Sequence, residues 1–320
     1  MKVLFINNIY KQCGVYQYGL RIYEILQPLG ISPPQDIEYI YREIHHYAEY
    51  IQALSENPEI QYVIYNYHQT TISWLNTNNI QRKVKNIGII HESPDNLFDI
   101  VIQIEPDSLE NNRHYSIPRP IFENIHFSEV IVSQTRRDFI QKYTDTSLPI
   151  FGSFGFGFEF KGFEKIIQNI NEQYEEAIIK FVIPVAHYDG NYNRINEIHN
   201  SCFSFPRKPG IKLMITHEFF TNTELLQFLH SNTMNIFLYD TLQNRSISST
   251  IDYALSVKKP LGISDSHMFR HIYDDSICVY KTPIATIMEN SVEYCKVFVE
   301  KYSHDNMRAK FREILLANSS

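Results

Sequence analysis

The sequence alternates short apolar runs of strand length with segments of helical length, and this alternation constrains the fold more than any other feature. The first run, Lys2–Asn7 (KVLFIN), has an apolar centre typical of a strand that is buried on both faces. Val15–Leu26 follows it with apolar residues at helical spacing. Because parallel strands need a long crossover between them, the alternation predicts an α/β protein whose parallel sheets carry helices on both faces.

The alternation runs through the chain twice, on either side of a predicted linker at Ser147–Pro149. We predict two Rossmann-like domains, residues 1–147 and 148–302, and a C-terminal helix within residues 303–320 that packs back on the N-terminal domain. The strands expected in the first half are Lys2–Asn7, Ile37–Tyr41, Tyr62–Tyr65, Asn86–Ile90, Phe98–Ile104 and Val130–Ser133. The elements expected in the second half are strands Ile150–Ser153, Ile178–Ile183, Ile211–Ile215, Asn235–Tyr239 and Leu261–Ser264, and helices Gly162–Gln173, Arg194–Ser201, Thr223–Leu229, Glu293–Tyr302 and Asn306–Leu316.

Composition narrows the function classes. Across 320 residues, 43% are hydrophobic and 20% are charged, as in ordinary globular proteins. The net charge of -7 argues against a nucleic-acid partner held by phosphate attraction. The four cysteines are widely separated, and no stretch approaches the ~20 apolar residues that a membrane span needs. We expect a cytoplasmic protein without a transmembrane segment, for which peripheral membrane contact stays open.

Two histidines follow apolar runs of predicted strands: His68 comes directly after VIYNY (Val63–Tyr67), and His91 comes directly after Asn86–Ile90. Ligands of open α/β sheets bind outside the carboxyl ends of the strands, so both side chains are candidates for a cleft. The alternative is that each is a structural hydrogen-bonding group, which is common for a histidine at a strand end. Their spacing, with no nearby third ligand, does not suit a metal site.

The stretch Gln243–Asp265 joins two predicted strands through the start of a short helix. A helix N-terminus presents free N–H groups and the positive end of the helix dipole, and it therefore binds anions. Ser246, Ser248 and Ser249 supply hydroxyls there, and Arg245 supplies a fork of donors. A capped connecting loop without a ligand is the alternative interpretation.

The run Gly152–Gly162 (GSFGFGFEFKG) is rich in glycine, which allows a backbone to approach a ligand closely. Lys161 lies at the predicted start of a helix, and an anion between it and the helix would relieve its repulsion from the dipole. The alternative is a loop with a solvated lysine. The pattern of a phosphate-binding P-loop is absent.

Thr216–Phe220 (THEFF) follows another predicted strand. His217 and Phe219 offer backbone groups and a ring face on which a nucleotide base could stack. A buried loop anchor is the alternative of equal weight.

Taken in order, these motifs resemble the GT-B glycosyltransferases, especially the large retaining family that uses nucleotide-activated sugars (family 4-like, group 1). SFGFGFEFKG resembles that family's glycine loop, whose Lys-Gly opens a helix, and NRSISSTIDYALSVKKPLGIS resembles its Glu-x7-Glu region. CGVYQYGLRIYEIL and IGIIHE resemble its first loop and helix and its histidine-bearing strand end. The resemblance covers nearly the whole chain, and it implies a GT-B fold in which two Rossmann-like domains face each other across a cleft.

The resemblance implies roles residue by residue in the second domain. Lys161 matches the lysine that neutralises the donor diphosphate, and Arg245 is our candidate for the arginine that usually accompanies it. Ser248 and Ser249 are expected beside the diphosphate. Asp252 matches the carboxylate that binds the ribose, while Asn244 stands where the family places its first glutamate.

In the first domain, His91 matches the histidine that contacts the donor sugar near the reacting centre. Gly14 matches the glycine whose backbone approaches that sugar. The resemblance implies no metal and no cofactor beyond a nucleotide sugar, such as a UDP- or GDP-sugar, as co-substrate. No spaced Asp-x-Asp motif stands in a suitable loop, which agrees with metal-independent transfer.

The expected activity is transfer of a sugar, with retention, from a nucleotide-sugar donor to a hydroxyl of a glycan, lipid-linked or protein acceptor. Two alternatives remain at this point. One is a nucleotide-sugar epimerase or hydrolase on the same fold, and the other is a non-catalytic GT-B protein that binds a nucleotide sugar.

Overall fold

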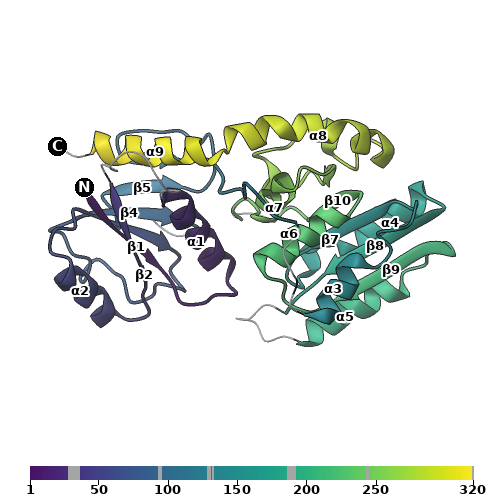
Figure 1. Cartoon of the computed structure of the whole chain (residues 1–320), viewed down its shortest axis with the longest axis horizontal. Coiled ribbons are helices and arrows are strands. Elements are labelled where there is room, and N and C mark those ends of the chain that lie inside the picture. Colours follow the sequence, from purple (N-terminus) through teal and green to yellow (C-terminus); the bar gives the residue numbers. More distant parts are fainter. Residues whose placement is uncertain are drawn as a thin grey trace. The chain divides into compact units, whose positions relative to one another are not determined.

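The computed structural model describes residues 1–27, 37–92, 96–127, 131, 133–185, 192–242 and 245–318. These residues form two compact units, each with its own sheet and core (Figure 1). The first unit comprises residues 1–120 together with 301–320, and the second comprises residues 121–300.

The sheet of the first unit has six parallel strands in the order β2-β1-β3-β4-β5-β6. Their bounds are β1 Lys2–Asn7, β2 Glu38–Glu43, β3 Tyr62–Tyr67, β4 Lys85–Ile90, β5 Ile100–Gln103 and β6 His114–Ser116. The helices of this unit are α1 Gly14–Leu26, α2 Tyr47–Glu56 and α9 His304–Ala317. β6 was not predicted, because its three residues are all half-exposed and carry no apolar pattern.

Both faces of this sheet are buried, because successive strand residues point to opposite sides. Val3 and Phe5 of β1 belong to one hydrophobic core, which α1 and α9 cover. Leu4 and Ile6 belong to a second core, which includes buried residues of α2 and of the segment before β4. As predicted, Lys2–Asn7 is continuously apolar because both faces of β1 are buried.

The sheet of the second unit has five parallel strands in the order β11-β10-β7-β8-β9. Their bounds are β7 Ile150–Phe154, β8 Glu176–Val182, β9 Gly210–Thr216, β10 Met234–Phe237 and β11 Leu261–Ile263. The α-helices are α3 Gln134–Gln141, α4 Phe163–Gln173, α5 Tyr192–Ser204, α6 Asn222–Ser231, α7 Thr250–Ser256 and α8 Ile284–Lys301, and the 3-10 turns are η1 Glu159–Lys161, η2 His267–Phe269 and η3 Asp275–Ile277.

Helices also cover both faces of the second sheet. Ala177, Ile179 and Phe181 of β8 share a core with buried residues of α4, α5 and α8. Lys180 points to the opposite face, where its fully buried Nζ donates a 2.9 Å hydrogen bond to the carbonyl of Ile140 in α3. The sequence-based fold class, α/β with two Rossmann-like units, is therefore confirmed.

The two units meet in the sequence at residues 120–121 and 300–301, whereas the predicted domains divide at 147–148 and 302–303. Residues 121–147 belong to the second unit because α3 packs there. Phe139 contacts the rings of Phe220 and Phe228, and Arg136 Nε lies 2.9 Å from a carboxylate oxygen of Glu224. Of the predicted strand Val130–Ser133, residues 130 and 132 lie outside the described part, and Ile131 and Ser133 are not in a strand.

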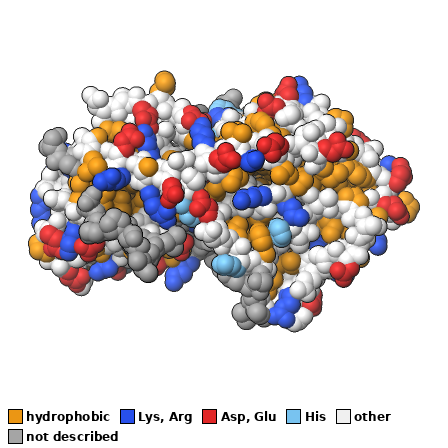
Figure 2. Space-filling model, turned by 45° about the horizontal axis from the view of Figure 1, so that its top comes forward, with side chains coloured by type: hydrophobic (Ala, Val, Ile, Leu, Met, Phe, Trp, Pro, Cys, Tyr) orange, Lys and Arg blue, Asp and Glu red, His pale blue; other side chains and the backbone are white. Residues whose placement is uncertain are grey.

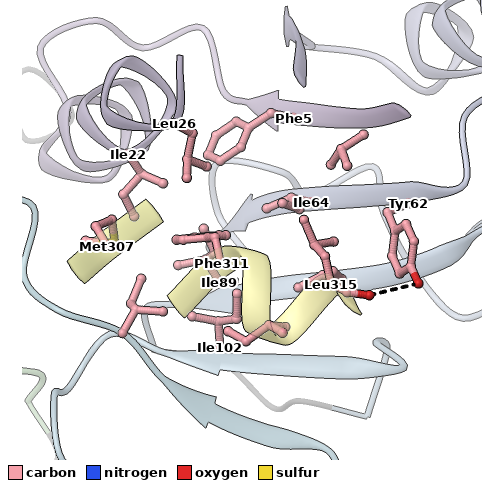
Figure 3. Close-up of a cluster of buried hydrophobic side chains, with 14 of the residues drawn as sticks. Phe5, Ile22, Leu26, Tyr62, Ile64, Ile89, Ile102, Met307, Phe311 and Leu315 are labelled. Carbon is pink, nitrogen blue, oxygen red and sulfur yellow. Dashed lines mark hydrogen bonds between the residues drawn. The ribbon is translucent and has the colours of Figure 1, made fainter. Parts of the chain in front are cut away.

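α9 completes the core of the first unit although it lies at the far end of the sequence. Its buried face consists of Met307, Phe311, Ile314 and Leu315, which pack with strand residues and with α1 (Figure 3). The hydroxyl of Tyr62 in β3 donates hydrogen bonds to the carbonyls of Leu315 (3.3 Å) and Asn318 (2.6 Å). The first unit is therefore discontinuous in sequence.

α8 is longer than predicted, since it begins at Ile284 and the sequence indicated a helix only from Glu293. Its first half, IATIMENS, contains β-branched and small polar residues that weaken a helical pattern. Ile284, Ile287 and Ser291 nevertheless bury one face of it against the sheet. Among the described helices, none is both long and apolar enough to cross a membrane.

Candidate functional site

Each sheet has a switch point, where successive crossovers leave a central strand in opposite directions. In the first unit the switch lies between β1 and β3, and in the second unit between β7 and β10. The orders correspond to the flavodoxin-like and Rossmann arrangements, in which ligands bind at the carboxyl ends of the strands beside the switch. These two strand-end regions are the candidate sites.

At the first switch point, buried amides link β1, β3 and β4. Asn66 in β3 donates from Nδ2 to Oδ1 of Asn7 in β1 at 2.8 Å and to the carbonyl of Val15 at 2.6 Å. Its Oδ1 lies 2.7 Å from Nε2 of His91. Gly19 of α1 makes room for this amide, because a Cβ there would lie 2.3 Å from Asn66 Nδ2. The amides thus fix the position of the His91 ring.

The contact with Asn66 determines which ring nitrogen of His91 carries the proton. Asn66 Oδ1 can only accept, so Nε2 of His91 carries the proton and donates it, which leaves Nδ1 as the acceptor of a neutral ring. Burial, and to a smaller extent the neighbouring His68 and Arg119, lower the pKa of His91 to about 3. The edge of the ring packs against Tyr18, with centroids 5.0 Å apart. At neutral pH, His91 is a hydrogen-bonding group and not a cation.

His68 lies in the same strand-end region. Its Nδ1 accepts the backbone N–H of Thr70 at 3.3 Å, and its Nε2 lies 3.7 Å from Oε2 of Glu92. The residues that follow, 93–95, are outside the described part of the chain. Gly14 is the first residue of α1, and a Cβ built there would meet nothing within 4 Å. Its backbone is therefore open to approach.

At the second switch point, the ammonium of Lys161 lies over the rings of Tyr239 and Phe160. Nζ of Lys161, at the end of η1, lies 3.8 Å from the ring centroid of buried Tyr239 and 5.3 Å from that of Phe160. Gly155, at φ 154°, leaves room for this side chain, since a Cβ there would lie 3.3 Å from Lys161 Cε. Within the described residues, Lys161 makes no ion pair with a carboxylate.

A chain of hydroxyl groups joins Tyr239 to the start of α7. The hydroxyl of Tyr239 donates to Oγ1 of Thr250 at 3.3 Å, and Thr250 Oγ1 lies 2.8 Å from Ser248 Oγ. Ser249 is the N-cap residue of α7, and its side chain makes no capping hydrogen bond. The structure thus brings Lys161, Ser248 and Ser249, all predicted site residues, into one region through Tyr239.

The other residues predicted from the Gln243–Asp265 stretch are placed differently. Arg245 is exposed, whereas Asp252 in α7 is fully buried. Gln243 and Asn244 lie outside the described residues. The structure therefore gives Arg245 access to solvent and shows the Asp252 carboxylate without an accessible surface.

His217 and Phe219 follow β9, as predicted, but both ring nitrogens of His217 are engaged within the protein. Nδ1 lies 2.9 Å from the carbonyl of Ile183, to which it donates, and Nε2 lies 2.9 Å from Nδ1 of His199. The carbonyl of Phe219 accepts a 3.0 Å hydrogen bond from Arg136. A ligand at these residues would meet ring faces rather than the nitrogens of His217.

The arrangement suits anion binding in the second unit and neutral hydrogen bonding in the first. Across the parts of the chain that the structure describes, no three His, Cys, Asp or Glu residues are grouped to hold a metal ion. Two contributors were missed from sequence, Asn66 and Tyr239. An amide inside the apolar run YVIYNY and a tyrosine at the end of NIFLY were the available signals.

The two sheets, their strand orders and their covering helices define the class of the fold, which is α/β with two Rossmann-like units. No protein-family model and no curated protein sequence matches the chain. Its similarity is to solved structures at low sequence identity, and that similarity extends over the full length of the chain.

HepE (Alr3699) of Anabaena in complex with UDP aligns with a TM-score of 0.67 at 12% identity, covering 99% of this chain and 100% of that one. A glycosyltransferase from Rickettsia africae aligns with a TM-score of 0.63 at 11% identity, covering 100% of this chain and 99% of that one. Sucrose-phosphate synthase from Thermosynechococcus elongatus gives 0.63 at 12% identity, covering 99% and 100%. The chain therefore has the fold of GT-B glycosyltransferases.

Proposed function

We propose that the protein is a glycosyltransferase that moves a sugar from a nucleotide-diphosphate donor to an acceptor hydroxyl. Its fold is shared with glycosyltransferases, one of which is described in complexes with UDP-glucose and with UDP and glucose. Fold alone supports several chemistries, so the proposal also needs a site whose groups suit this one.

The observation that carries the proposal is the ammonium of Lys161. It lies over Tyr239 at the switch point of the second sheet, without a carboxylate partner among the described residues. A ring face attracts a cation but does not neutralise its charge, so the ammonium still attracts an anion. Such a charge stabilises a diphosphate, and stabilises it more as the phosphate becomes the leaving group.

The transfer breaks the bond between the anomeric carbon and the phosphate oxygen and forms a bond from that carbon to the acceptor oxygen. The bond electrons leave with the diphosphate, and the acceptor hydroxyl gives its proton to an oxygen of the leaving diphosphate. Lys161, exposed Arg245 and the hydroxyls of Ser248 and Ser249 are our candidates for binding the diphosphate. Transfer without a metal and with retention of configuration is part of the proposal, on the resemblance noted above.

His91 is our candidate for contact with the transferred sugar. A neutral imidazole held by Asn66 can exchange hydrogen bonds with sugar hydroxyls without adding charge near an oxocarbenium-like centre. His68 and the backbone at Gly14 are placed in the same strand-end region of the first unit. Asp252, His217 and Phe219 remain candidates for the nucleoside, where Asp252 would need to become accessible when the donor binds. Asn244 remains a candidate cleft residue near the transferred sugar, where the resembled family places its first glutamate.

The test is a donor screen with UDP-, GDP- and ADP-sugars that follows binding by calorimetry and release of the nucleoside diphosphate with and without glycan acceptors. We expect one donor to bind and to release its diphosphate, faster when an acceptor is present. A donor that binds without turnover under every acceptor would support the binding-protein alternative. Absence of binding by all donors would overturn the proposal.

A further inference from the structure

A cavity lies beside α4 in the second unit. Its volume is about 420 Å³, within the range of small-molecule sites. One wall is a stripe of α4, and the other is formed by the segments that follow β10, β11 and η3. Its lining includes Lys165, Gln168, Glu172, Asp240, Asp265 and Tyr280. Neither Lys161 nor any residue of α7 lines it, but Tyr239, whose ring lies 3.8 Å from Lys161 Nζ, does.

The charges of this cavity disfavour an anionic ligand. Glu172, Asp240 and Asp265 contribute three carboxylates, whereas Lys165 contributes one ammonium. That ammonium already forms an ion pair with Asp240. A diphosphate or sugar phosphate would therefore meet net negative charge here, in contrast to the surroundings of Lys161.

The remaining groups form a mixed set of donors and acceptors. The carboxylate of Asp265 is exposed and makes no hydrogen bond or ion pair with the described residues. The side-chain amide of Gln168 donates a 2.9 Å hydrogen bond to Glu172. Its amide oxygen accepts no hydrogen bond from the described residues. Burial, together with Asp240 and Asp265, raises the pKa of Tyr280 to about 12, so that its hydroxyl stays a donor.

The ring of Tyr280 is the apolar element of this wall, and 46% of the residue is exposed. Sugars combine hydroxyls, which carboxylates and amides bind, with C–H faces that stack on aromatic rings. We propose that this cavity is a binding site for a neutral saccharide beside the site around Lys161, with which it shares Tyr239. It would hold a glycan by its hydroxyls without taking part in bond cleavage.

The experiment uses the full chain and a panel of neutral trisaccharides: maltotriose, cellotriose, mannotriose and N-acetylchitotriose. Saturation-transfer NMR detects binding, and ¹³C-tyrosine labelling, assigned with Tyr280→Phe, reports whether the Tyr280 ring is the site. We expect at least one trisaccharide to bind and to shift the Tyr280 signal, also in the presence of saturating UDP. Glucose 6-phosphate, as the anionic probe, should not shift it.

The variants Asp265→Ala and Tyr280→Ala are expected to weaken that binding at least tenfold. Asp145→Ala and Tyr192→Ala are matched controls, since Asp145 and Tyr192 are exposed residues of the same unit outside the cavity. The proposal is overturned if no trisaccharide binds, if spermidine alone shifts Tyr280, if UDP abolishes the binding, or if both cavity variants bind as the controls do. None of these outcomes requires that the chain transfer a sugar.

Discussion

Gly162 separates η1 from α4 in a left-handed conformation, at φ 64°. A Cβ at this position would lie 2.0 Å from the carbonyl oxygen of Leu238, so that both strain and overlap oppose any side chain. Gly162→Ala should lower the free energy of unfolding by about 3 kcal/mol or more. Chemical denaturation measures the change.

Gly14→Ala is the matched control for that prediction. A Cβ there meets nothing within 4 Å, and the residue already begins α1. Since alanine favours helices over glycine by about 1 kcal/mol, stability should stay equal or rise by no more than that. Equal losses in the two variants would contradict the assignment of Gly162 as the constrained turn.

The lowered pKa of His91 predicts that the free energy of unfolding depends on pH. Its pKa falls from 6.5 to about 3 on folding, so the unfolded chain binds a proton between these values that the folded chain does not. Stability should therefore be unaffected by this group above pH 6.5 and should fall as the pH decreases below it. At pH 5 the loss is at most about 2 kcal/mol.

The variant His91→Gln lacks this titration and should lose less stability than the wild type between pH 7 and pH 5. Denaturation of both proteins at the two pH values measures the difference. Identical losses in the two proteins would contradict a neutral, desolvated His91. His199 and His230 also have lowered pKa values, but they are present in both proteins and cancel in the comparison.

Among the helices, α9 has one buried and one exposed position at which substitution by alanine should change stability by different amounts. Phe311 is fully buried in the core of the first unit, whereas Leu316 on the same helix is 48% exposed. Phe311→Ala should cost about 3–5 kcal/mol because it leaves a cavity. Leu316→Ala should cost less than about 1 kcal/mol, and thermal unfolding compares the two. A larger loss for Leu316→Ala would show that α9 packs by its other face.

Elements with a strong apolar period were predicted within a few residues, as β3, β4, β8 and α4 show. β6 and the first half of α8 were missed because tertiary packing, and not local pattern, holds them. In the candidate sites, Lys161 and Ser248 were indicated by sequence. The amide of Asn66 and the ring of Tyr239 were not, because their roles come from strands that are neighbours only in the sheet.

At the scale of the whole molecule, the two units differ in how the sequence encodes them. The second unit is one continuous segment with its own sheet and core, whereas the first needs α9 from the end of the chain. A fragment of residues 121–300 should therefore fold alone, with one cooperative thermal transition. A fragment of residues 1–120 should not, because the core that α9 covers would be exposed.

Addition of a peptide spanning residues 301–320 should restore structure to the 1–120 fragment, measured by circular dichroism. If 1–120 folds to full stability without it, the division of the chain is different from the one described.

Over the face drawn in Figure 2, Lys and Arg side chains are interspersed with Asp and Glu and form no single basic field.

The second unit is proposed to bind a nucleoside diphosphate through the ammonium of Lys161. The most direct measurement is calorimetric titration of UDP, GDP and ADP into the wild type, Lys161→Ala and Lys296→Ala, in which Lys296 is an exposed lysine of α8. We predict that one diphosphate binds the wild type and the Lys296 variant equally and binds Lys161→Ala at least tenfold more weakly, since a charged hydrogen bond contributes about 1.5–3 kcal/mol. Unchanged affinity in Lys161→Ala would contradict the account.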